Sequence, residues 1–207
     1  MPEDFQDEYV EQIRGADEVA RRCIVLHAVL AVGHDEPRDE IVAWLRREGL
    51  WSSVSPLEAD FLLSELPTDQ QFINATWRAE SLYALLWALG LVADLPSPTQ
   101  LCDLQFLKSL VPPLLGSVGA FILSARLRAD AEIHDANEQI YQIHWRVRDA
   151  QFRNEPTPTG KLARMSVADS EPPAESYDAG VVQERHYALN WLIGYCGQEW
   201  DAITTDT

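Results

Sequence analysis

The stretch SLYALLWALGLVA, residues 81–93, contains no charged side chain. Its leucines, alanines and aromatic residues fall on every side of a helical wheel, which indicates a helix packed by neighbours all round. Upstream, Thr68 and Gln71 form the pattern of a capping box, in which each side chain bonds the backbone N–H of the other residue. The sequence therefore predicts a long central helix that runs from Thr68 to about Val92.

Helical patterns also occur on both sides of this segment. They are apolar residues spaced three and four apart, prolines in first turns and a second capping box at Ser55–Glu58. The expected helices cover residues 5–32, 37–49, 55–66, 116–128, 130–152 and 181–196. Alternating strand patterns and Asn-Gly or Asp-Gly hairpin turns are lacking. We predict an all-α fold in which residues 1–207 form a single compact domain of about seven helices.

Two segments lie outside this helical pattern. Residues 154–180 are rich in proline and are expected to form a long surface loop. Residues 197–207 form an acidic tail, which we expect to be docked because Trp200 places a large apolar ring on it. Asp201 and Asp206 then need positive partners. The expected partners are the arginines of the least acidic region, Arg126, Arg128, Arg146 and Arg148.

The net charge of the chain is -17 and is unevenly distributed. It is -6 over residues 1–50, -5 over 51–100, +1 over 101–164 and -7 over 165–207, which sums to -17. Affinity for nucleic acid or for an anionic membrane comes from clustered Lys and Arg, so we predict neither as a partner. An acidic surface commonly serves solubility, and it also favours a protein partner of basic character.

The cysteines and the N-terminus indicate the compartment. Cys23, Cys102 and Cys196 lie far apart in the sequence, which argues against a disulfide framework and fits a reducing environment. The acidic N-terminus lacks the basic start of a signal peptide. The longest uncharged run, residues 109–125, is short and is interrupted by proline and glycine, unlike a membrane span. We expect a cytoplasmic protein.

Motifs of the common catalytic classes are missing from the sequence. It has no His-Glu-x-x-His pair, no paired cysteines, no phosphate-binding glycine loop, no Gly-x-Ser-x-Gly elbow and no repeated Glu-x-x-His. We therefore predict no metal site and no cofactor.

The tryptophans are expected to build the core. A surface that stacks nucleic-acid bases needs interleaved basic residues, which these positions lack. The tryptophans expected to be buried are Trp44, Trp51, Trp77, Trp87, Trp145 and Trp191.

Polar residues embedded in apolar helical segments form the candidate site. They are Arg78, Glu80, Tyr141, His144, Arg148, Glu184, Arg185 and His186. An isolated buried carboxylate costs several kcal/mol, so Glu80 must pair with an arginine. The candidate arginines are Arg78, Arg146, Arg148 and Arg185. The cluster is either a cleft, with Glu80 and His144 or His186 as acid and base, or a network that locks the helices together.

Several short segments resemble one protein family. They are Trp77-Arg78-Ala79-Glu80 with Leu86-Trp87-Ala88-Leu89-Gly90, Tyr141 with His144-Trp145, Glu184-Arg185-His186-Tyr187-Ala188-Leu189-Asn190-Trp191, and the ending Trp200-Asp201 with Asp206-Thr207. Together they resemble domain-of-unknown-function family 4272 over residues 20–207. This resemblance implies a helical fold and implies no activity, substrate or cofactor.

Two classes of function remain open on the sequence. The first is a non-enzymatic intracellular binding protein that uses its acidic surface to engage a basic protein partner. The second is a hydrolase-like enzyme, or a small-molecule sensor, with a cleft near Glu80, His144 and His186. An accessible pocket around these groups favours the second class, whereas buried and mutually satisfied groups favour the first.

Overall fold

The computed structural model describes residues 11–154 and 173–207, and within them the chain is helical and has no strand. Its α-helices are α1 Ala16–Gly33, α2 Arg38–Arg47, α3 Pro56–Leu63, α4 Asp69–Ala88, α5 Leu104–Leu110, α6 Gly119–Ser124, α7 Asp130–Asn154 and α8 Ala179–Ile193. Single 3-10 turns occur at η1 Trp51–Ser53, η2 Ala174–Ser176, η3 Tyr195–Gly197 and η4 Trp200–Ala202. The predicted all-α class is confirmed.

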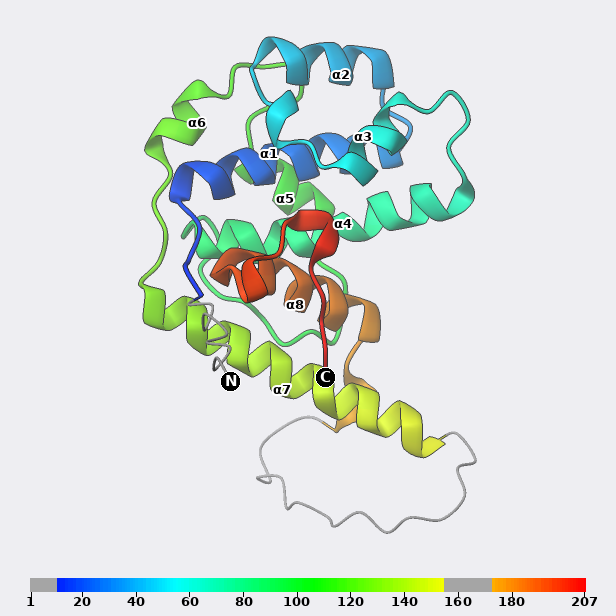
Figure 1. The fold of residues 1–207 in the computed structure, drawn as a ribbon, viewed down its shortest axis with the longest axis vertical. Helices are drawn as coiled ribbons and strands as arrows, with labels where there is room; N and C mark the ends of the chain where they lie inside the picture. Colours follow the sequence, from blue (N-terminus) through cyan, green and yellow to red (C-terminus); the bar gives the residue numbers. More distant parts are fainter. Residues whose placement is uncertain (1–10, 155–172) are drawn as a thin grey trace, which may run out of the picture.

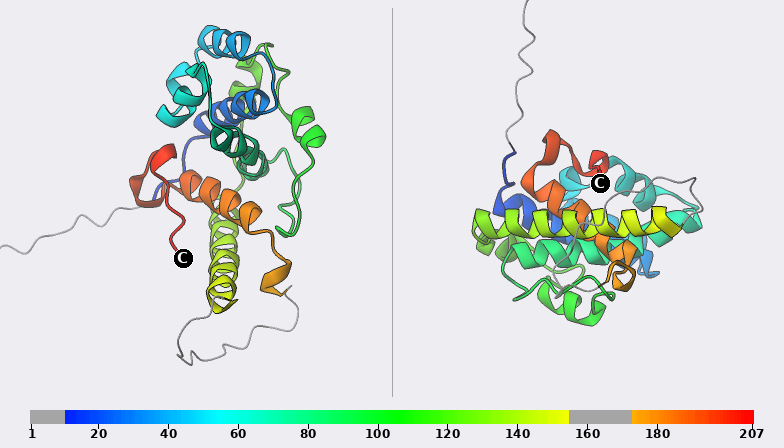
Figure 2. Two further views of the ribbon diagram at one scale, coloured as in Figure 1. Left: turned by 90° about the vertical axis from the view of Figure 1, so that its right-hand side faces the viewer. Right: turned by 90° about the horizontal axis from the view of Figure 1, so that it is seen from below.

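The helices are arranged in layers around α4 (Figure 1). From top to bottom in this view, α2 and α3 cover α1, α1 packs on α4, α4 packs on α8, and α7 lies beneath α8. Seen from below, α7 crosses the molecule as one long rod (Figure 2). The central position predicted for the uncharged helix is confirmed.

Helix α4 begins and ends on specific backbone contacts. Its start is the predicted capping box, in which both reciprocal bonds between Thr68 and Gln71 are present. Its end lies at Ala88, four residues before the predicted end at Val92. Gly90 has a φ of 71°, and the N–H groups of Gly90 and Leu91 bond back to carbonyls of the last turn. This left-handed glycine cap stops the helix, as glycine does at many helix ends.

From Cys23 to Val32, helix α1 is buried on all sides because it separates two hydrophobic clusters. Leu26 and Leu30 pack into the larger cluster, built mainly from α4, α7 and α8. Val25 and Val29 pack into the smaller cluster, built mainly from α2 and α3. Apolar burial on both sides of α1 thus joins the upper and lower layers.

Other predicted boundaries need correction. Helix α1 begins at Ala16, and residues 11–15 are not helical; the remainder of the predicted start lies outside the described residues. Helix α5 was not predicted, although Asp103 caps it by accepting the N–H groups of Gln105 and Phe106. Its seven residues are too few to show helical periodicity between flanking prolines. Most of the predicted loop at 154–180 lies outside the described residues, and α8 already begins at Ala179, after the N-cap Asp178.

The tryptophan prediction is wrong at one position. Trp44, Trp87 and Trp191 are buried, and Trp51 and Trp77 are half-buried. Trp145 is exposed on α7, with 43% of its surface accessible. It lies one residue beyond the buried face of that helix, so the helical register places its ring outside the core.

The C-terminal segment is docked, as predicted. Trp200 is 2% exposed and packs edge-on against Tyr187 and Trp191 at ring-centroid distances of 5.0 and 5.3 Å. The predicted partner of Asp201 is wrong, however. Its carboxylate accepts the Ser55 hydroxyl at 2.6 Å and the Leu57 backbone N–H at 2.8 Å, both at the start of α3. Asp206 accepts the Thr204 hydroxyl at 2.8 Å rather than an arginine in the described contacts.

Candidate functional site

The predicted polar residues form three separate pairs, and the most buried pair joins α4 to α8. Arg185 Nε and Nη2 both donate to Glu80 Oε2, at 3.0 and 2.9 Å. The side chains of Arg185 and Glu80 are only 2% and 1% exposed. Their remaining groups are also bonded: Arg185 Nη1 donates to the Pro96 carbonyl, and Glu80 Oε1 accepts the Cys102 N–H, each at 2.6 Å. This confirms the predicted buried ion pair of Glu80 and identifies Arg185 as its arginine.

A second pair lies on the same two helices, beside the first and nearer the surface. Arg78 Nη1 lies 3.0 Å from Glu184 Oε2, and both side chains are partly exposed. Ser81 donates to the same Glu184 oxygen at 2.7 Å. The Arg78 guanidinium also lies over the Tyr187 ring, 4.9 Å from its centroid. Each of the two ion pairs joins a residue of α4 to a residue of α8, so together they hold the two helices against each other.

The third pair is a contact between two histidines on α7 and α8. The Nδ1 atoms of His144 and His186 are 2.9 Å apart, so one imidazole donates and the other accepts. Burial lowers the pKa of both rings, and that of His186 falls to about 4. Both rings are therefore neutral at pH 7, and in this contact one Nδ1 carries the hydrogen while the other accepts it.

The last two predicted residues face solvent on α7. Tyr141 lies edge-on to His186 at 5.9 Å between ring centroids and is 36% exposed. The Arg148 guanidinium lies over the Phe152 ring, 5.6 Å from its centroid. The structure therefore does not bring the predicted residues into one cleft.

A pocket of about 420 Å³ does open beside the histidine pair, between α7, α8 and the C-terminal segment. Of the predicted residues, only Tyr141 and His186 line it. Four carboxylates, from Glu11, Asp135, Glu138 and Asp206, make it acidic. The other lining residues are His134, Asn137, Asn190, Ile193 and Tyr195. Except for the two predicted residues, sequence reasoning missed this set, because it is collected from four segments that are far apart in the chain.

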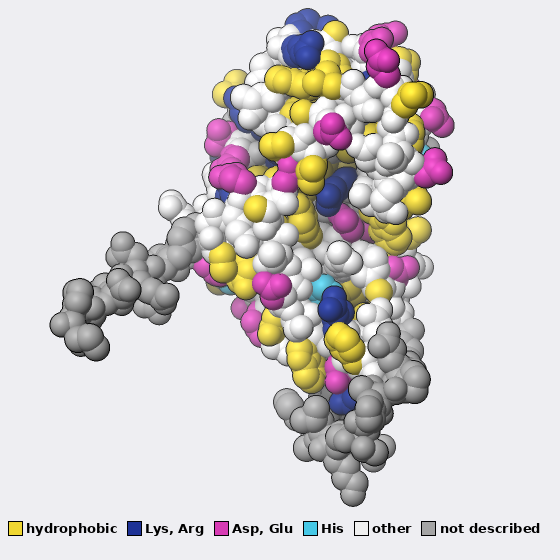
Figure 3. Space-filling model, turned by 45° about the vertical axis from the view of Figure 1, so that its right-hand side comes forward, with side chains coloured by type: hydrophobic (Ala, Val, Ile, Leu, Met, Phe, Trp, Pro, Cys, Tyr) yellow, Lys and Arg dark blue, Asp and Glu magenta, His cyan; other side chains and the backbone are white. Residues whose placement is uncertain are grey.

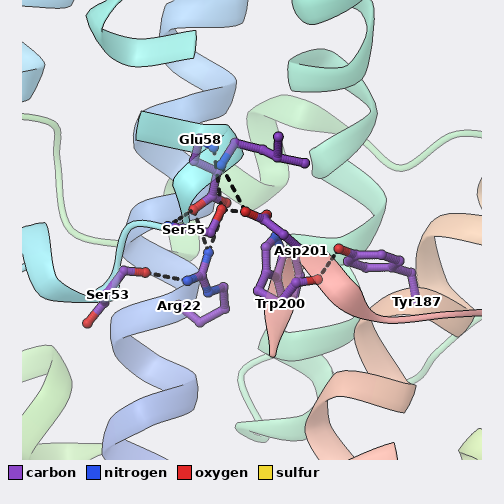
Figure 4. Close-up of polar contacts among 8 residues, drawn as sticks. Arg22, Ser53, Ser55, Glu58, Tyr187, Trp200 and Asp201 are labelled. Carbon is purple, nitrogen blue, oxygen red and sulfur yellow. Dashed lines mark hydrogen bonds and ion pairs between the residues drawn. The ribbon is translucent and has the colours of Figure 1, made fainter. Parts of the chain in front are cut away.

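A further network, also missed, holds the C-terminal segment against α1 and α3 (Figure 4). Arg22 on α1 donates from Nη1 to both oxygens of Glu58, at 2.8 and 2.7 Å, and from Nη2 to the Ser53 carbonyl. Glu58 also accepts the Ser55 N–H at 2.9 Å, and the Ser55 hydroxyl in turn donates to Asp201. The capping box at Ser55 was a local signal for this network.

The Trp200 ring lies next to Arg22, whose guanidinium carbon is 4.7 Å from the ring centroid. Together they line a second pocket, of about 520 Å³, between α1, η1 and the C-terminal segment. Trp191, Asp201 and the serines of η1 complete much of its wall. Arg22 Nε and Trp200 Nε1 have no hydrogen-bond partner within the described residues.

Two further observations concern the described part of the chain. No group of three or more His, Cys, Asp or Glu side chains in residues 11–154 and 173–207 is arranged to hold a metal ion. No helix in these two ranges is long and apolar enough to cross a membrane.

Comparison with known proteins supports the resemblance seen in the sequence. A family model described as a domain of unknown function, DUF4272, matches residues 4–203. Neither the curated proteins nor the solved structures contain a match to the chain. Since the family match covers nearly the whole sequence, the chain belongs to the DUF4272 family.

Proposed function

We propose that this protein is a non-enzymatic binding protein whose acidic pocket receives a cationic side chain of a basic partner protein. The observation that carries this proposal is the set of four carboxylates around the pocket beside α7 and α8. Its volume of about 420 Å³ falls in the usual range of ligand pockets, roughly 300–1,000 Å³.

The electrostatics of the pocket support a cation as its occupant. No Lys or Arg of residues 11–154 or 173–207 lines the pocket, and His186 is neutral at pH 7 because burial lowers its pKa to about 4. Tyr141 and Tyr195 add ring faces, which attract cations. The net charge of -17 would also speed the approach of a basic partner. On the face drawn in Figure 3, Lys and Arg side chains form only small, separate groups.

The enzyme alternative has less support in this geometry. A general acid or base must reach its substrate, and Glu80 is buried and fully engaged by Arg185 and Cys102. His186 lines the pocket but is 2% exposed, and its Nδ1 is occupied by His144. A small organic cation, bound without chemistry, is the second candidate, because it would use the same open carboxylate-lined space.

The test is a binding titration between the full chain and a fluorescently labelled peptide rich in arginine and lysine. The fluorescence anisotropy of the peptide reports binding. We expect binding that weakens as salt rises, and no binding of an acidic peptide of the same length. The double variant Asp135→Asn with Asp206→Asn should weaken binding several-fold.

A matched control separates the pocket from the overall charge. The double variant Glu40→Gln with Glu65→Gln removes the same two charges from exposed positions on α2 and after α3. Equal loss of affinity in both double variants, or no binding of the basic peptide, would overturn the pocket as the site. Titration with a small organic cation such as spermidine distinguishes the second candidate.

We also propose a cytoplasmic location and no affinity for nucleic acid. Cys23, Cys102 and Cys196 are all free thiols, which supports a reducing compartment. The scarcity of basic side chains supports repulsion of phosphate backbones. Cell fractionation tests the cytoplasmic location. A salt-sensitive micromolar complex with random duplex DNA would contradict the proposed lack of affinity for nucleic acid.

A further inference from the structure

Helix α7 presents an aromatic stripe to solvent, which begins at Tyr141 beside the α7–α8 pocket and continues toward the C-terminal end of the helix. Tyr141, Trp145, Arg148 and Phe152 follow one another at spacings of four, three and four, which places them in one row on a helix. The three aromatic side chains are 36%, 43% and 59% exposed. Ile133, Ile140 and Val147 occupy the buried face and belong to the larger hydrophobic cluster. A row of large aromatic side chains at the surface is typical of an interaction site.

Charges are distributed unequally along the same helix. Its first half carries four acidic residues and no Lys or Arg. They are Asp130, Glu132, Asp135 and Glu138. Its second half carries three arginines and one acid, Arg146, Arg148, Arg153 and Asp149. A second α7 laid antiparallel would bring each acidic half beside a basic half, whereas a parallel one would place like charges together.

We propose that this face is the contact surface between two copies of the chain, paired through antiparallel α7 helices. A two-fold axis near Trp145 generates a self-complementary contact, as in most homodimers. Glu138 precedes Trp145 by seven residues and Arg153 follows it by eight. At an antiparallel crossing near Trp145, Glu138 of one copy therefore faces Arg153 of the other, and the Trp145 rings of the two copies meet at the axis.

The overall charge supports a contact centred on the second half of α7. Two chains of charge -17 repel each other, so a stable contact needs the least acidic part of the surface. The second half of α7, with three arginines and one acidic side chain, meets this need better than its acidic first half.

Sedimentation equilibrium of the full chain tests this proposal. We expect a reversible dimer at micromolar concentration, and at least about a tenfold rise in its dissociation constant for Trp145→Glu, since a central tryptophan often dominates an interface. Leu123→Glu, at an 82% exposed position on α6, is the matched control and should leave the dimer unchanged.

Charge variants test the antiparallel arrangement itself. Arg153→Glu and Glu138→Lys should each weaken the dimer, and the double variant should recover most of the affinity because the pair is reversed. A chain that stays monomeric, a dimer insensitive to Trp145→Glu, or a double variant weaker than both single variants would overturn the proposal. A monomeric chain that still binds the basic peptide would leave the proposed function intact.

Discussion

Arg185 directs two N–H groups at a single oxygen of Glu80, while the other Glu80 oxygen accepts a backbone N–H from the segment before α5. The buried ion pair thus connects three segments, namely α4, α8 and the loop at Cys102. Removing one partner of a buried ion pair leaves the other charge stranded away from water, which is costlier than losing an ordinary hydrogen bond.

Glu80→Gln is therefore expected to lower the free energy of unfolding by roughly 3–5 kcal/mol. Denaturant titration monitored by circular dichroism measures it. Glu132→Gln removes a partly exposed ion pair with Arg128, just before α7, and should change stability by at most about 0.5 kcal/mol. A Glu80 variant as stable as this control would show that the buried pair contributes nothing.

Gly180 lets the first turn of α8 approach the ring of Trp77. A Cβ added at Gly180 would lie 2.7 Å from Trp77 Cζ3 and closer still to Cη2. Gly180→Ala should therefore destabilise the protein by about 1–3 kcal/mol through overpacking. Gly119→Ala, where an added Cβ has no atom within 4 Å, should be neutral or slightly stabilising. Thermal melting of both variants decides the matter, and equal melting temperatures would contradict the close contact.

Trp200 anchors the C-terminal segment. Because its ring is buried among Arg22, Tyr187 and Trp191, Trp200→Ala should cost about 3–5 kcal/mol in denaturant unfolding. Deleting residues 199–207 should cost at least as much. Trp145→Ala removes a tryptophan of the same size from the surface and should stay within about 0.5 kcal/mol in dilute protein. An unchanged midpoint after the deletion would mean that the segment does not stabilise the fold.

His27 should make stability depend on pH. Burial lowers its pKa from the usual 6.5 to about 4, with a smaller contribution from Lys108, and its Nδ1 has no described hydrogen-bond partner. Below pH 6.5 the unfolded chain protonates this histidine while the folded protein does not. Its contribution is therefore fully present above pH 6.5 and is lost as the pH falls toward 4.

The expected loss from His27 over this range is on the order of 3 kcal/mol. Unfolding free energies measured at several pH values should accordingly fall less steeply for His27→Leu than for the parent chain. His34→Gln, at the exposed end of the same helix, should follow the parent. Parallel curves for His27→Leu and the parent would rule out a neutral buried His27.

How far the sequence predicts this structure depends on the distance over which each signal acts. The all-α class, the start of α4 at Thr68 and its central position were readable because capping boxes and helical periodicity involve neighbours in the chain. The need to pair Glu80 was also readable, since burial of a lone carboxylate is unfavourable wherever it occurs. Which arginine pairs with Glu80 could not be predicted, because the pairing with Arg185 instead of Arg78 depends on how α4 and α8 cross.

The sequence by itself thus determined the helical elements other than α5, the burial of Trp200 and the kind of residue that had to be paired. Tertiary structure alone decided that Asp201 meets Ser55, 146 residues away in the chain, and not the arginines of the least acidic region. It likewise gathered Asp135, Asn190 and Asp206 around one pocket. The reason is physical: caps and periodicity act within one or two helical turns, whereas long-range polar contacts depend on how packed helices orient the residues at their ends and faces.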